Sequence, residues 1–213
     1  MNSRFQLHFF WGKHAPLSTL TGAALIIMAS SRLAHGILCF GAILWVYCLT
    51  ALIYFSAKSI MPTKGRMIIL LFLSSAACSI FILLMSLINP LLLSGTWFFL
   101  VLLPPFCIGS GIFEDTGSIE TREILPRTAL EGSILGLLII AISLIREPLG
   151  LGSLSFPGGI WGIIEIFGSP EDSEGFFPIR FFSIPAGGFL ILAFVVAVFR
   201  YFQSRNSGME DNS

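Results

Sequence analysis

Four cysteines are the side chains of this sequence best suited to hold a metal or a redox cofactor. Cys39, Cys48, Cys78 and Cys107 each stand inside an apolar stretch. No two of them have the C-x-x-C spacing of a zinc site or a redox dithiol. A disulfide framework, which is typical of small secreted domains, is not expected either. The sequence therefore predicts buried thiols, or ligands of a cofactor embedded in an apolar environment.

Cys107 has the most unusual surroundings of the four. It follows Pro104 and Pro105, and it precedes Gly109 and Gly111. Proline cannot donate a backbone hydrogen bond and glycine loosens a helix, so a broken helix is expected here. Inside a membrane, such a break is tolerated only where protein or a cavity satisfies the backbone. Cys107 is thus expected to be buried, either as an inert thiol or as a cofactor ligand.

Motifs of soluble enzymes are absent from the sequence. There is no Walker A loop, no H-E-x-x-H metal motif and no G-x-S-x-G nucleophile motif. The three histidines, His8, His14 and His35, do not pair at ligand spacing. No binding motif for NADH or flavin is present, which predicts a chain without a catalytic site of its own.

The composition indicates which environment positions these residues. Of the 213 residues, 55% are hydrophobic and only 11% are charged, and the mean hydropathy is +0.89. Soluble domains have about 25% charged residues, and so few polar groups do not cover a water-exposed surface. The sequence therefore predicts an all-α integral membrane protein in contact with the lipid bilayer. The formal net charge of zero gives no reason to expect nucleic acid as a partner.

Apolar runs long enough to cross a bilayer divide the chain. A span needs about 20 apolar residues, and the uncharged stretch between Arg66 and Glu114 is long enough for two, with a turn near Asn89 and Pro90. Polar residues at 30–36 divide the first long run into two. A cleaved signal peptide is not expected. Six transmembrane helices are predicted, at residues 16–31, 36–57, 67–88, 95–113, 128–146 and 182–203.

Basic residues predict the orientation of these helices. With both termini inside, the cytoplasmic side carries most of the basic residues, so an N-in, C-in orientation is predicted. The expected organisation is a cytoplasmic segment 1–15, a six-helix domain 16–203 with an outer loop 147–181, and a disordered cytoplasmic tail 204–213. Residues 159–167 of the loop are expected to form a short interfacial helix. The cytoplasmic basic residues would be Arg4, Lys13, Lys58, Lys64, Arg66, Arg122, Arg127, Arg200 and Arg205, and the outer ones Arg32, Arg146 and Arg180.

Charged residues near the span ends are expected to have structural roles. Arg32 is interpreted as an interfacial anchor, and Arg146 and Glu147 as a pair that pins the end of the outer loop. A charge at the bilayer centre costs about 2.5–3.5 kcal/mol on insertion scales, and a position at a span end removes most of this cost. No carboxylate is expected in mid-membrane, which argues against a self-contained proton or sodium carrier.

Three short runs resemble a known family. They are Ala129-Leu130-Glu131-Gly132, Ile145-Arg146-Glu147-Pro148-Leu149-Gly150 and Ile184-Pro185-Ala186-Gly187-Gly188-Phe189. They resemble the Rnf/Nqr membrane subunits, and within these the RnfE/NqrD-like branch. The resemblance covers nearly the whole chain, and it also includes Trp11, Gly22, Pro62, Arg66, Cys107 and Gly111.

The resemblance implies a fold and a function. Members of the family have six helices arranged as two inverted three-helix repeats. Two homologous subunits of opposite orientation pack together in a complex of the bacterial cytoplasmic (inner) membrane. The complex couples electron flow between NADH and ferredoxin or quinone to sodium or proton pumping. The expected partners are therefore an RnfA/NqrE-like subunit and the other subunits of the complex, and the paired subunits share a [2Fe-2S] cluster.

The ligand positions of that cluster are only partly kept. Each family subunit contributes one cysteine from its first span and one from its fourth. The fourth-span position matches Cys107, whereas the first-span position falls on Ala24. Cys39 stands fifteen residues after Ala24 and is a weaker candidate ligand. A [2Fe-2S] cluster needs four thiolates or close equivalents, so either the partner supplies three ligands or the chain keeps its scaffold role without the cluster.

Two other classes of function stay open at this point. A small secondary transporter or channel subunit would also have inverted repeats and broken helices. A purely structural assembly subunit predicts that Cys107→Ser has no effect. The proteins with which this chain assembles distinguish these hypotheses. A transporter works alone or as a homo-oligomer, whereas an Rnf/Nqr-type subunit requires a complex that contains flavin and iron.

Overall fold

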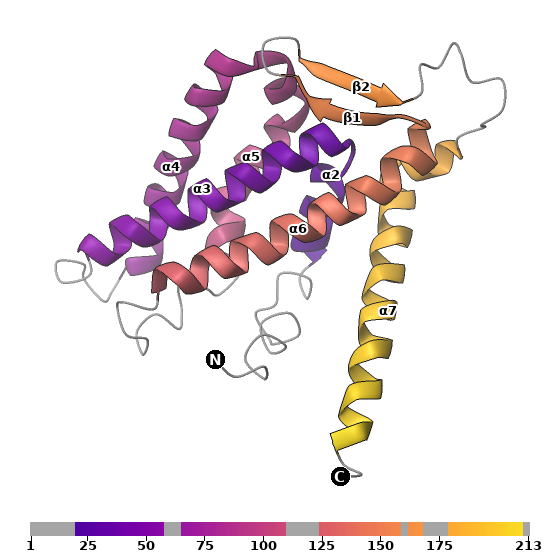
Figure 1. Ribbon diagram of the computed structural model, residues 1–213. Coiled ribbons are helices and arrows are strands. Elements are labelled where there is room, and N and C mark those ends of the chain that lie inside the picture. The colour runs from indigo at the N-terminus through magenta and orange to yellow at the C-terminus, as the bar shows by residue number, and fades with distance from the viewer. Residues whose placement is uncertain (1–19, 58–64, 110–123, 159–161, 168–178, 211–213) are drawn as a thin grey trace.

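Helices dominate the structure, a computed structural model that describes residues 20–57, 65–109, 124–158, 162–167 and 179–210. Figure 1 shows their arrangement. In chain order, the elements are α2 (Leu20–Ala29), α3 (Leu33–Ala57), α4 (Arg66–Ile88), α5 (Pro90–Gly109), α6 (Ile124–Leu151), β1 (Leu154–Pro157), β2 (Ile163–Phe167), the 3-10 helix η3 (Arg180–Ser183) and α7 (Pro185–Glu210).

Four of the described helices are long and apolar enough to cross a membrane. They are α3, α4, α5 between Pro90 and Ile108, and α6 from Thr128 to Leu151. With ten residues, α2 is about 15 Å long, which is half of a hydrocarbon core of about 30 Å. The apolar part of α7, Pro185–Val198, is also shorter than these four. The chain is therefore a mostly helical membrane protein, and six full spans stay a prediction.

The turn predicted near Asn89 and Pro90 is confirmed, but α5 begins at Pro90 rather than at residue 95. Proline is favoured at the first position of a helix, where its missing N–H costs nothing. Asn89 caps this helix, because its Oδ1 accepts a hydrogen bond from the backbone N–H of Leu92 at 2.9 Å. Gly95 does not break the helix. Instead it makes room for His35, since a Cβ at Gly95 would lie 2.5 Å from Nε2 of that ring.

The outer loop contains a β-hairpin where a short helix was expected. Strand β2 pairs antiparallel with β1, and Phe156 lies opposite Ile164. The prediction of a helix at 159–167 is therefore wrong for residues 163–167, which form a strand. The fold is mostly helical but also contains this hairpin. Isoleucine-rich segments favour strands, and Gly162 has the positive φ of 81° that glycine adopts without strain. The Gly158 N–H donates to Gly162 O at 2.9 Å and links the two strands, while residues 159–161 of the expected helix lie outside the described part.

The chain also differs from expectation at its C-terminal end. Residues 204–213 were expected to be disordered, but α7 continues to Glu210. Helix α7 starts at a proline and has no further proline in its sequence, so no backbone N–H of the later turns is missing. Residues 211–213 lie outside the described part, as do 1–15 and residues 16–19 of the first predicted span.

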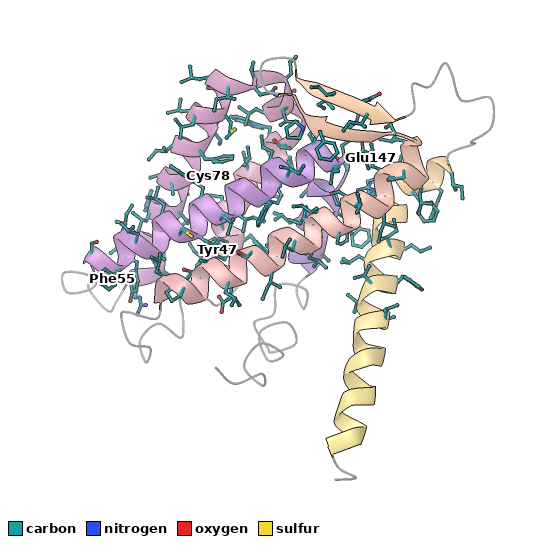
Figure 2. All side chains as sticks on the ribbon, in the orientation of Figure 1. Tyr47, Phe55, Cys78 and Glu147 are labelled. Carbon is teal, nitrogen blue, oxygen red and sulfur yellow. The ribbon has the colours of Figure 1, made fainter. Side chains whose placement is uncertain are left out.

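Helix α3 is the centre of the bundle. It packs against α4, α5 and α6, while α2 packs against α5 and α7. Tyr47 is 1% exposed and lies between α3 and α6, whereas Phe55, near the end of α3, is half exposed (Figure 2). The hairpin, η3 and the α2–α3 and α4–α5 junctions lie at one end of the bundle, and α2 begins and α7 ends at the other (Figure 1). Polar residues far apart in the sequence therefore meet at the hairpin end.

Candidate functional site

Arg146 is buried near the end of α6 and ties three segments together. Its side chain and backbone are only 3% exposed. Nη1 donates to the carbonyl oxygen of Ile27 at 2.7 Å, Nε to Phe182 O at 2.9 Å and Nη2 to Ser183 O at 2.9 Å. Ile27 belongs to the last turn of α2, where unpaired carbonyls carry partial negative charge. The guanidinium thus compensates the C-terminal end of α2 and fastens η3 beside it.

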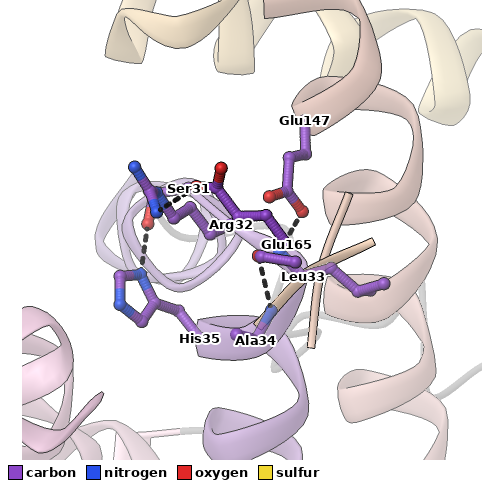
Figure 3. A network of polar contacts seen from close by, with 8 residues as sticks. Ser31, Arg32, Leu33, Ala34, His35, Glu147 and Glu165 are labelled. Atoms are coloured by element: carbon purple, nitrogen blue, oxygen red, sulfur yellow. Dashed lines mark hydrogen bonds and ion pairs between the residues drawn. The ribbon is translucent and has the colours of Figure 1, made fainter. Parts of the chain in front are cut away.

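Glu147, the next residue, binds a helix N-terminus, that of α3. It is fully buried, and its Oε2 accepts a hydrogen bond from the Leu33 N–H at 2.7 Å (Figure 3). Ser155 of β1 takes the following N–H, that of Ala34, on its Oγ at 3.4 Å. A carboxylate at a helix N-terminus is favoured by the positive end of the dipole. Glu147 Oε1 has no hydrogen-bond partner among the described residues.

The two charged side chains therefore bind opposite sides of the interruption between α2 and α3. Helix α2 ends at Ala29 and α3 begins at Leu33, and Arg146 binds the first end while Glu147 binds the second. The prediction that this pair has a structural role agrees with these contacts. Both residues are buried inside the protein, where the carbonyls and N–H groups of the interruption need partners other than water.

Glycines of the same sequence runs make room for these contacts. A Cβ at Gly188 would lie 2.7 Å from Ile27 Cγ2 and 3.3 Å from Arg146 Cζ. A Cβ at Gly150 would lie 2.7 Å from the backbone nitrogen of Ser183. Residues of two of the three short runs, 145–150 and 184–189, thus meet around one guanidinium. The third contributes Gly132, which packs closely against α3 at Ile43 and Leu44.

The hairpin is fastened over this junction. Arg32 Nη1 lies 3.3 Å from Glu165 Oε1 of β2, and both side chains are partly exposed. His35 Nδ1 and Ser31 Oγ are 3.0 Å apart on the neighbouring turn (Figure 3). At the other end of the hairpin, Asn89 Nδ2 donates to Gly162 O at 2.9 Å. Arg32, which was interpreted as an interfacial anchor, thus pairs with a carboxylate that sequence reasoning had not matched to it.

The cysteines lie away from this junction. Cys39 and Cys107 are fully buried and Cys78 is 3% exposed, and none of the four cysteines is in a disulfide. Within the described ranges, no group of three or more histidine, cysteine or acidic side chains is arranged to hold a metal. Ala24, half-buried on α2, supplies no ligand. A [2Fe-2S] cluster held by the described part of this chain alone therefore does not fit.

The contact that Cys78 makes was not predicted from the sequence. The Cys78 Sγ lies 3.2 Å from the carbonyl oxygen of Leu100 on α5. Helix α5 contains Pro104 and Pro105 and nevertheless continues to Gly109. The helix break expected before Cys107 is thus absent up to Gly109, and Gly111 lies outside the described residues. Pro104 itself was the available signal, because a proline leaves the carbonyl four residues earlier without its helical partner.

No protein-family model matches the chain, and no curated protein matches it either.

Proposed function

We propose that this chain is a membrane-embedded scaffold subunit of an ion-translocating electron-transfer complex of the Rnf/Nqr type. The proposal places it in a bacterial cytoplasmic membrane, next to a homologous subunit of inverted orientation. The observation that carries it is the meeting of two family-like runs at Arg146. A run containing Arg146 lies against one containing Gly188, where a Cβ would come within 3.3 Å of Arg146 Cζ.

The interruption between α2 and α3 favours a scaffold over a transporter. In transporters, half-helix ends point at the substrate or the coupling ion. Here Arg146 binds the C-terminal end of α2 and Glu147 binds the N-terminal end of α3. The protein thus fills with its own charges the places that a transported ion would take, which suits a rigid framework.

The exposed helix faces suit a subunit that is covered by lipid and by other helices. Large apolar side chains of α4 and α5 are exposed, among them Phe72, Leu87 and Leu91. Lipid and partner helices are equally apolar, so either covers such faces without cost. In the electron-carrying form of this proposal, Cys107 gives one ligand and partner subunits give the others. In the scaffold form, the chain gives none.

Purification from native membranes in mild detergent tests the proposal. Membrane subunits that contain flavin and iron are expected to co-purify with the chain. A homo-oligomer without flavin and iron would contradict the proposal and favour the transporter.

EPR spectra of the purified complex separate the two forms of the proposal. A [2Fe-2S] signal that is lost in Cys107→Ser, but kept in the control Cys48→Ser, would establish the electron-carrying form. Loss in Cys39→Ser as well would assign the second ligand. A signal that survives all three substitutions would leave the scaffold form.

A further inference from the structure

Helix α5 has a missing donor in its interior. In a regular helix, the N–H of residue 104 would bond to the carbonyl of Leu100. Residue 104 is proline and has no N–H. Leu100 is fully buried, so water does not replace the donor. A buried carbonyl without a donor is costly, which makes the continuation of α5 to Gly109 a feature that requires an explanation.

The thiol of Cys78 stands where the missing donor is needed. It projects from α4, its Sγ lies 3.2 Å from Leu100 O, and the residue is 3% exposed. A thiol is a weak hydrogen-bond donor, and this contact is protected from water. If residue 104 had an N–H, the helix itself would donate to Leu100 O, and the thiol would only add a second donor to a carbonyl that already had one.

We propose that Cys78 is a positioning residue: its S–H replaces the N–H that Pro104 lacks, holds α5 helical across the two prolines, and so keeps Cys107 inside the core. Cys107 follows Pro104 by three residues, which is about one helical turn. Movement of that turn moves Cys107 directly. Cys78 has to keep its proton for this role, which separates it from Cys107 as a candidate ligand. The inference goes beyond the proposed function and requires neither iron nor a partner subunit.

A double-mutant cycle on the full-length protein in lipid nanodiscs tests the role. The measured quantity is the rate at which Cys107 reacts with a membrane-permeant maleimide, followed on its own peptide by mass spectrometry. Cys78→Ala is expected to raise this rate by about fivefold, the effect of one lost hydrogen bond on a local opening. Cys78→Ser retains a donor and is expected to keep the slow rate. Cys48→Ala, at a half-buried cysteine of α3, is the matched control.

Pro104→Ala makes the test specific. Alanine restores the N–H to Leu100 O, so Cys78→Ala is expected to have little further effect in that background. An equal acceleration in both backgrounds, or a Cys78→Ser variant as fast as Cys78→Ala, would overturn the proposal and leave only a packing role. These outcomes do not depend on whether flavin and iron co-purify.

Infrared spectra keep the proposal testable if Pro104→Ala does not fold. The S–H stretching band of a hydrogen-bonded thiol is shifted to lower frequency. The difference between wild-type protein and Cys78→Ser is expected to show such a shifted band. A Cys78 band at the position of a free thiol would overturn the proposal.

Discussion

At the residue scale, single side chains form hydrogen bonds with backbone groups of other segments. Glu147 accepts from an N–H that lies 114 positions earlier, and Arg146 bonds a carbonyl 119 positions earlier. Cys78 bonds a carbonyl of the neighbouring helix. In lipid, no water takes over when such a partner is lost. Each of these side chains is therefore expected to contribute more to stability than a surface contact does.

The carboxyl of Glu147 is the first such contact to test. Glu147→Ala is expected to destabilise the protein by about 1–3 kcal/mol, because the buried N–H of Leu33 loses its acceptor. Glu147→Gln keeps an acceptor oxygen and is expected to lose less. Glu165→Gln is the control, since its partly exposed pair with Arg32 contributes about 0–1 kcal/mol. SDS-induced unfolding in mixed micelles measures the difference, and equal effects of Glu147→Ala and Glu165→Gln would refute it.

Arg146 is expected to be irreplaceable by lysine. Its planar guanidinium donates to three carbonyls at once, whereas a lysine ammonium is a single point of charge on a flexible stem. Arg146→Lys is expected to cost about 2 kcal/mol or more in the same unfolding assay. Arg32→Lys keeps a single ion pair and serves as the matched control. The prediction is wrong if the two substitutions cost the same.

At the element scale, close approach of helices depends on a few glycines. Gly188 lets α7 approach both the last turn of α2 and Arg146. Gly95 lets α5 approach His35 at the start of α3. Helix α4 and helix α5 are joined at Asn89, which also holds the hairpin. The hairpin end of the bundle is therefore assembled by tight backbone contacts, and small increases in side-chain size are expected to disturb it.

Gly188→Ala and Gly41→Ala form a matched pair of substitutions. A Cβ at Gly188 would meet Ile27 at 2.7 Å, whereas nothing lies within 4 Å of a Cβ at Gly41. Gly188→Ala is expected to destabilise by about 1–3 kcal/mol through overpacking. Gly41→Ala is expected to stabilise α3 by about 0.5–1 kcal/mol, because alanine loses less conformational entropy in a helix. Unfolding curves that place both changes on the same side of wild type would contradict this pair.

At the scale of the whole molecule, consecutive described helices alternate in direction. The hairpin consequently lies on the opposite side from the start of α2 and the end of α7 (Figure 1). Such an arrangement agrees with a protein whose outer loop faces one compartment and whose last helix ends in the other. Which side faces the cytoplasm is predicted from the distribution of basic residues.

The N-in, C-in orientation predicts a labelling pattern in intact cells. In a background in which the four cysteines are replaced by serine, Glu165→Cys is expected to react with an impermeant maleimide added outside. Ser213→Cys is expected to react only after the inner membrane is permeabilised. The physical reason is that the basic residues stay on the cytoplasmic side during insertion. The reverse pattern would show that the orientation is opposite.

Local chemistry explains what could be read from the sequence alone. The membrane class follows from hydropathy, the turn near Asn89 from the proline that follows it, and the burial of Cys107 from its apolar setting. Only the tertiary structure decided that Glu147 meets Leu33, that Cys78 meets Leu100, and that residues 163–167 pair as a strand. Hydropathy and periodicity describe neighbours along the chain. These contacts join residues that are not neighbours along the chain, because backbone N–H and carbonyl groups take the partners that the packing brings to them.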